Sequence, residues 1–165
     1  MRYNKIRKMD ISNGPGVRIS IFMQGCHFHC KDCFNSETWD FEGGKEFTDE
    51  TINRVLELCD KEYIKGLSIL GGEPLHPKNI EGTTRLAKKF KEKFGDKTIW
   101  VWSGFLFETV NKDTLKYIDV LVDGQFKTEL FNPTLKYKGS SNQRVIDVQK
   151  SLKNNSICLY NEEKF

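Results

Sequence analysis

The sequence predicts an α/β fold with a mainly parallel, open sheet, carried by a single domain over residues 1–165. Runs of β-forming residues alternate with amphipathic helical segments, which is typical of right-handed βαβ units. A length of 165 residues suits one domain with its own hydrophobic core. With roughly four or five strands expected, the sheet is too short to close into an eight-stranded barrel.

The elements follow one another along the chain with clear boundaries. Val17–Met23 lies between glycine-containing turns and is rich in β-branched residues, so we expect a strand there. Residues 49–63 carry apolar side chains at helical spacing, and Thr48 or Asp49 can cap this helix. The alternation continues with strands at 67–70, 98–102, 120–122 and 144–148 and with helices at 79–94 and 112–117.

Composition and charge exclude several classes of protein. No run approaches the roughly 18 consecutive apolar residues of a membrane span. No apolar stretch follows the charged N-terminus, so we expect a cytoplasmic protein without a signal peptide. A net charge of +3 is too weak to indicate nucleic acid as the partner. The five cysteines are an odd number without an export signal, which argues against a disulfide framework.

Three of the cysteines, Cys26, Cys30 and Cys33, have the spacing C-x3-C-x2-C. On a helix this spacing would place the thiols in one row, so a loop suits a compact metal centre better. Three alternatives stay open on spacing alone: buried or free thiols, a zinc ion with His27 or His29 as fourth ligand, and an iron–sulfur cube with one iron open. The other two cysteines, Cys59 and Cys158, are expected to pack in the core and against a C-terminal strand.

A second motif, Gly71-Gly72-Glu73-Pro74, follows a predicted strand. Two glycines let a ligand approach the backbone closely, and Pro74 restricts Glu73 to extended geometry. Backbone carbonyls and a carboxylate at this point would receive an ammonium group. Alone, the run is better explained as a β-turn before a helix; together with the cysteine run it indicates a ligand site.

The two motifs together resemble the radical S-adenosylmethionine (SAM) superfamily. Three further runs are similar to the glycyl-radical activating enzymes: NGPGVR at 13–18, QGC at 24–26 and CFNSETW at 33–39. The short length and the runs LVDGQF at 121–126 and GSSNQRVID at 139–147 resemble one branch of that group. This branch comprises the activating proteins of anaerobic (class III) ribonucleoside-triphosphate reductase.

The resemblance implies an abbreviated, partial (βα) barrel of radical SAM type, with a 4Fe–4S cluster on Cys26, Cys30 and Cys33 and SAM on the fourth iron. The amino group of SAM would lie at the glycine-rich turn, its adenosyl part beside the third cysteine, and its ribose or methionine side at later strand ends. The residues implied to contact it are Asp32, Cys33, Phe34, Gly71, Gly72, Glu73, Ser103 and Asp123. Asp32 departs from the family pattern, since many members have an aromatic residue there.

The implied activity is reductive cleavage of SAM to methionine and a 5′-deoxyadenosyl radical, which removes a Cα hydrogen from a glycine of the large reductase subunit. A low-potential electron donor such as flavodoxin is the second expected partner, with no nucleic acid and no membrane. The alternatives are a radical SAM enzyme acting on a small molecule, such as a deazaguanine-type synthase, and an activator of another glycyl-radical enzyme. A non-enzymatic zinc-binding module is a further alternative.

Overall fold

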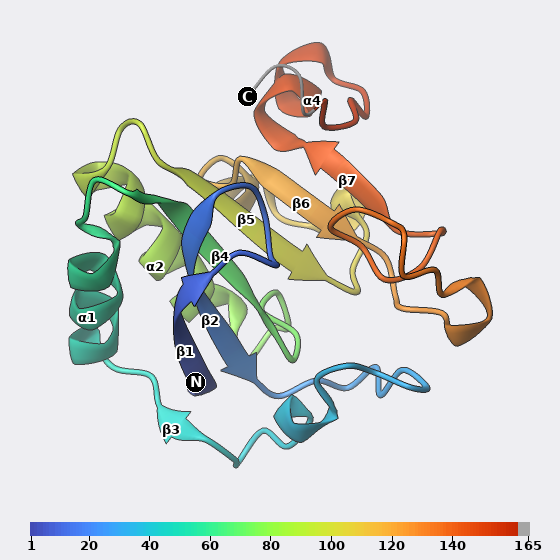
Figure 1. The fold of residues 1–165 in the computed structure, drawn as a ribbon, viewed down its shortest axis with the longest axis horizontal. Helices are drawn as coiled ribbons and strands as arrows, with labels where there is room; N and C mark the ends of the chain where they lie inside the picture. The colour runs from blue at the N-terminus through green and yellow to red at the C-terminus, as the bar shows by residue number, and fades with distance from the viewer. Residues whose placement is uncertain (162–165) are drawn as a thin grey trace.

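The computed structural model describes residues 1–161 and contains one seven-stranded sheet with the strand order β3-β1-β2-β4-β5-β6-β7 (Figure 1). The strands are β1 Arg2–Asp10, β2 Val17–Gln24, β3 Lys45–Glu46, β4 Ile64–Gly71, β5 Thr98–Ser103, β6 Val120–Asp123 and β7 Arg144–Asp147. The helices are α1 Asp49–Cys59, α2 Ile80–Lys93, α3 Lys112–Leu115 and α4 Val148–Asn154. None of these described helices is long and apolar enough to cross a membrane.

The predicted parallel sheet is confirmed at its centre, where β2, β4, β5 and β6 pair in parallel. The outer strands pair antiparallel, with β1 between β2 and β3, and β7 on β6. The sheet stays open, as expected for a partial barrel, because β3 and β7 are its two edges. Because the four central strands are parallel, their C-terminal ends lie side by side at one end of the sheet, where ligands of open α/β sheets bind.

Both faces of the central strands are buried, which explains why they appear in the sequence as nearly continuous apolar runs. On β2, Ile19, Ile21 and Met23 join the main core with residues of α1 and α2. A smaller cluster forms around Trp100 and Val122, with side chains from the C-terminal part of the chain packed against it. The second face is therefore covered by irregular chain rather than by helices.

The structure contains more elements than the sequence indicated. All five predicted strands are present, but β1, β3 and helix α4 were missed, so the expected count of four or five strands was wrong. Strand β1 was missed because its basic residues interrupt the apolar pattern expected of a strand. Two of them, Lys5 and Arg7, lie over the ring of Phe22, 4.8 and 5.1 Å from its centroid. The first predicted helix ends at Cys59 rather than at residue 63.

Arg18 lies near the start of β2, at the end of the sheet away from the C-terminal strand ends, and is fully buried, with 0% of its surface exposed. Its Nε donates to Ser68 Oγ (2.8 Å), Nη1 to Pro15 O (3.3 Å) and Thr98 Oγ1 (3.0 Å), and Nη2 to Leu67 O (3.1 Å) and Thr98 O (2.9 Å). Every one of these acceptors is neutral. Burial lowers the pKa of Arg18 to about 10, so the guanidinium stays charged at neutral pH and joins three strands and the loop before β2.

Replacing Arg18 by Ala should destabilise the protein by about 3 kcal/mol or more, because it leaves buried acceptors unpaired and opens a cavity. Urea unfolding of the variant and the wild type measures this difference. The matched control is Arg85→Ala, since Arg85 is 47% exposed and bridges Asp49 on the surface. That change should cost less than about 1 kcal/mol. Equal losses in the two variants would contradict a special role for Arg18.

Candidate functional site

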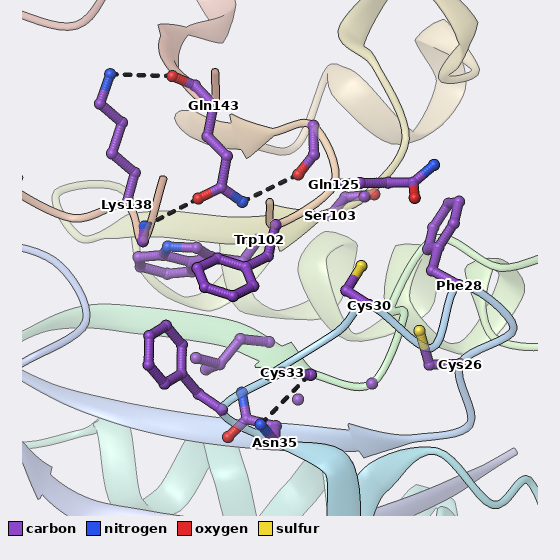
Figure 2. A pocket seen from close by; sticks show the side chains of 18 of the residues that line it. Cys26, Phe28, Cys30, Cys33, Asn35, Trp102, Ser103, Gln125, Lys138 and Gln143 are labelled. Carbon is purple, nitrogen blue, oxygen red and sulfur yellow. Dashed lines mark hydrogen bonds between the residues drawn. The ribbon is translucent and has the colours of Figure 1, made fainter. Parts of the chain in front are cut away.

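A cavity of about 500 Å³ lies at the C-terminal ends of the parallel strands. Its walls come from the loop after β2 (residues 25–39, called the cysteine loop here), from Gly71–Glu73 at the end of β4, and from Ser103 and Gly104 at the end of β5. Residues that follow β6 form a further wall, and Arg7, Ser12 and Asn13 line the cavity from β1 and the loop before β2. Figure 2 shows several of these residues around the cavity. Segments far apart in the sequence thus meet at one place, as the parallel topology predicts.

All three cysteines expected to bind metal line this cavity: Cys26, Cys30 and Cys33. They are free thiols and only partly exposed, and burial raises the pKa of the Cys26 and Cys30 thiols. The Sγ atom of Cys33 accepts the backbone N–H of Asn35 at 3.4 Å (Figure 2). The protein therefore offers three thiols to one space, with a backbone donor already directed at one of the sulfurs.

The cysteine loop has a defined irregular conformation, as predicted. Backbone bonds from Gly25 N to Thr38 O (2.6 Å) and from Cys26 N to Trp39 O (3.1 Å) close its base. His29 and Asp32 have φ of 47° and 60°, in the left-handed region that few side chains adopt. These turns break the straight row of thiols that a helix would produce.

The zinc alternative finds no support in the part of the chain that the structure describes, because no three Cys, His, Asp or Glu side chains there are arranged to hold one ion. The ring of His29 stacks on Trp39 with centroids 4.4 Å apart, and His27 packs 4.2 Å from Phe28. In an iron–sulfur cube the thiolates bind separate irons and need not meet at one atom. Three thiols around one cavity therefore fit a cube with one iron left open.

The two glycines of the second motif are required by the packing of the chain around the turn, and both line the cavity. Gly71 has φ of +107°, and a Cβ on it would lie 2.6 Å from Met23 N. A Cβ on Gly72 would lie 2.6 Å from Gly25 O and 2.9 Å from Thr38 O. Since both atoms belong to the base of the cysteine loop, any side chain at Gly72 would displace that loop.

Glu73 is almost completely buried, with 1% exposed, and its carboxylate joins the ends of two strands. Oε1 accepts the backbone N–H of Gly104 (2.6 Å), while Oε2 accepts Leu75 N–H (2.9 Å) and the Ser103 hydroxyl (2.8 Å). Burial raises the pKa of Glu73 to about 7, and the three donors act in the opposite direction. Ser103, expected near a ligand, lines the cavity and holds this carboxylate.

Asp123 and Asp32 are the two expected contact residues that do not line the cavity. Asp123 is fully buried, and its carboxylate accepts Arg144 Nε at 3.0 Å and Phe107 N–H at 2.8 Å. Asp32 is exposed and accepts the Thr128 hydroxyl at 2.7 Å. Both carboxylates thus hold neighbouring segments of chain. The backbone after Asp123, at Gly124, does line the cavity.

Phe34 lines the cavity and is also 64% exposed, so it lies at the rim. Its ring contacts Phe126 and Phe131, with centroids 5.0 and 5.8 Å away. These two residues belong to a long segment after β6 that sequence reasoning did not connect with the site. The signals for that segment were the runs at 121–126 and 139–147, which the family resemblance singled out while giving a role to Asp123 alone.

Comparison with known proteins agrees with this geometry. A family model described as a 4Fe-4S single cluster domain matches residues 12–146. The chain is 40% identical over 147 residues to the anaerobic ribonucleoside-triphosphate reductase-activating protein of Enterobacteria phage T4, which covers 88% of this chain and 93% of that protein. Proteins of the same name from Vibrio cholerae and Escherichia coli K12 are 38% and 37% identical, covering 87% and 88% of this chain and 96% and 97% of theirs.

The raised pKa of Glu73 predicts a pH dependence of stability. Between its ordinary value of 4.5 and about 7, the folded protein binds this proton more readily than the unfolded chain. The stabilisation is therefore present at low pH and is lost as the pH rises through about 7, by up to roughly 3 kcal/mol. Urea unfolding of the metal-free protein between about pH 5 and pH 8 measures it.

Glu73→Gln should remove this part of the pH dependence, because the amide does not titrate. Glu92→Gln, at an exposed position on α2, is the control and should keep the wild-type dependence. A Glu73→Gln protein whose stability changes with pH as much as that of the wild type would show that another group is responsible.

Proposed function

This chain belongs to the family of anaerobic ribonucleoside-triphosphate reductase-activating proteins, and we propose that it activates such a reductase by generating a radical on one of its glycines. The observation that carries the proposal is that three thiols and the Gly71–Glu73 turn line one cavity. The chemistry that a bound 4Fe–4S cluster and SAM would supply there is one-electron reductive cleavage of the sulfonium to methionine and a 5′-deoxyadenosyl radical, which takes a hydrogen atom from the glycine Cα.

In this proposal Cys26, Cys30 and Cys33 hold the cluster and leave one iron for SAM. The amino group of SAM would bind at the Gly71–Glu73 turn, where Oε1 of Glu73 accepts one hydrogen bond of 2.6 Å from the Gly104 N–H and keeps a further lone pair. Ser103 keeps that carboxylate in place. Cys33 and Phe34 border the adenosyl part. Asp32 and Asp123 do not contact SAM; they hold neighbouring chain segments in place through Thr128 and Arg144.

A protein substrate suits the size of the cavity. A volume of about 500 Å³ is what a single small ligand occupies, so SAM would fill most of the enclosed space. The glycine must then reach the cavity from its rim, where Phe34 and Phe131 are 64% and 47% exposed. A glycine on an extended loop of the large reductase subunit can do so because it carries no side chain.

Two further parts of the proposal concern the setting of the reaction. The electron comes from a low-potential donor such as flavodoxin, since the cleavage consumes one electron per SAM. The protein works in the cytoplasm, where thiols stay reduced, and its five cysteines are all free in support of this.

Replacing Cys26, Cys30 or Cys33 by Ala should abolish iron binding, because two thiolates cannot retain the cube. Iron content and absorbance near 400 nm after anaerobic reconstitution measure this loss. Cys59→Ala and Cys158→Ala are the matched controls, since neither residue lines the cavity, and they should keep wild-type iron. If Cys59→Ala lost iron as completely as Cys30→Ala, the ligand assignment would be wrong.

The activity itself is tested by anaerobic incubation of reduced protein, SAM and the large reductase subunit. A doublet glycyl signal should appear in the EPR spectrum of the reductase, with 5′-deoxyadenosine formed in step. The Cys30→Ala protein should give neither product. Efficient turnover of a free nucleotide or pterin without a protein partner would instead favour the small-molecule alternative.

A further inference from the structure

A long segment after β6, residues 124–140, forms one wall of the cavity and is called the strap here. Among its cavity-lining residues are Phe126, Phe131, Leu135 and Lys138. Most of the strap is exposed, and its regular structure is limited to a short 3₁₀ turn at Thr128–Leu130 and an isolated bridge from Phe131 to Ser140. Its position therefore depends on a small number of individual bonds.

Gln143 supplies several of these bonds and joins the two ends of the strap. Its side-chain Nε2 donates to Gly124 O at 3.0 Å, where the strap begins. Its Oε1 accepts the N–H groups of Gly139 (2.9 Å) and Ser140 (3.2 Å), where the strap ends. Its backbone carbonyl also accepts Lys138 Nζ at 3.0 Å (Figure 2). One amide side chain thus closes a loop of chain around the cavity wall.

The strap lies opposite the cysteine loop and touches it at the rim. The Thr128 hydroxyl donates to Asp32, and Phe34 packs on Phe126. The base of the cysteine loop, in contrast, is closed by bonds to Thr38 and Trp39, which are not part of the strap. The Cys30 thiol is also hydrogen-bonded to the backbone of Phe126 in the strap. Because the bonds at Gly25 and Cys26 hold the loop independently of the strap, a change in the strap should mainly alter the space between the two walls.

We propose that Gln143 is a positioning residue that sets the affinity for SAM by holding the strap as the cavity wall that faces the cysteine loop. This rests on the proposed function, because it takes SAM as the ligand of the cavity. It also gives a role to the run at 139–147: Gln143 fixes the strap, and the adjacent Arg144 fixes the end of β6 through Asp123.

The test is Gln143→Glu, which keeps the shape of the side chain. One carboxylate oxygen can still accept from Gly139 and Ser140, but the other faces the Gly124 carbonyl, so the donor is lost. The dissociation constant of SAM should rise about tenfold, the effect of leaving one buried group unpaired. It is measured from the change in the EPR spectrum of the reduced cluster as SAM is added. Iron content should equal that of the wild type.

Gln149→Glu is the matched control. Gln149 also donates its amide to backbone carbonyls, including Ile118 O at 2.7 Å, but it lies on α4 and does not line the cavity. This variant should bind SAM as the wild type does. Hydrogen exchange should also become faster in residues 125–139 of Gln143→Glu and stay unchanged there in Gln149→Glu. A general loss of stability would not produce that local difference.

Three results would overturn the inference: wild-type SAM affinity in Gln143→Glu, equal weakening in both variants, or loss of iron together with SAM. If Gln143→Glu does not fold, Asn142→Asp decides, because it removes the bond from Asn142 Nδ2 to Gln125 O in the strap (2.8 Å) and Asn142 does not line the cavity. That variant should weaken SAM binding with iron retained, and unchanged binding would refute the role of the strap. A wild-type protein that carries the cluster but shows no response to SAM would instead refute the proposed function.

Discussion

The site depends on one contact between two backbones, where the end of β4 meets the end of β2. Gly72 N–H donates to Met23 O at 2.9 Å, and Glu73 N–H donates to Gly25 O at 2.8 Å. No side chain intervenes, since neither Gly71 nor Gly72 has room for a Cβ. The register of the parallel pair, with Met23 opposite Gly71, therefore sets the distance between the cysteine loop and the glycine-rich turn. The base of the cysteine loop and the buried carboxylate are held together for this reason.

This contact extends across the sheet through Glu73. Its carboxylate leaves β4 and accepts donors from Ser103 and Gly104 at the end of β5. A buried carboxylate is stable only where donors satisfy it, so the position of Glu73 is fixed as firmly as a piece of backbone. Three neighbouring strand ends are thereby held in a single arrangement. A ligand that binds beside Glu73 meets a surface that is already ordered, so little conformational entropy is lost on binding.

Much of this could be predicted from the sequence, because the information is local. The strand before each motif shows β-branched residues, and the cysteine and glycine spacings are short-range patterns. The partners of the acidic residues were not predictable in this way. Asp123 was placed correctly at a strand end, but its partner Arg144 comes from the antiparallel strand β7, whose pairing no local pattern reveals. The strap was missed because irregular chain has no periodicity, although its residues form a full wall of the cavity.

The N-terminal and C-terminal ends of the parallel strands differ in how firmly the chain around them is held. At one end the buried Arg18 uses all five N–H groups on neutral acceptors from neighbouring strands and the loop before β2. At the other, the strap is mostly exposed and rests on a few separate hydrogen bonds. Local opening is least costly where few apolar contacts and exposed bonds hold a segment. The strap is therefore the wall of the cavity that opens at least cost, while the strand ends beneath it are held by more bonds.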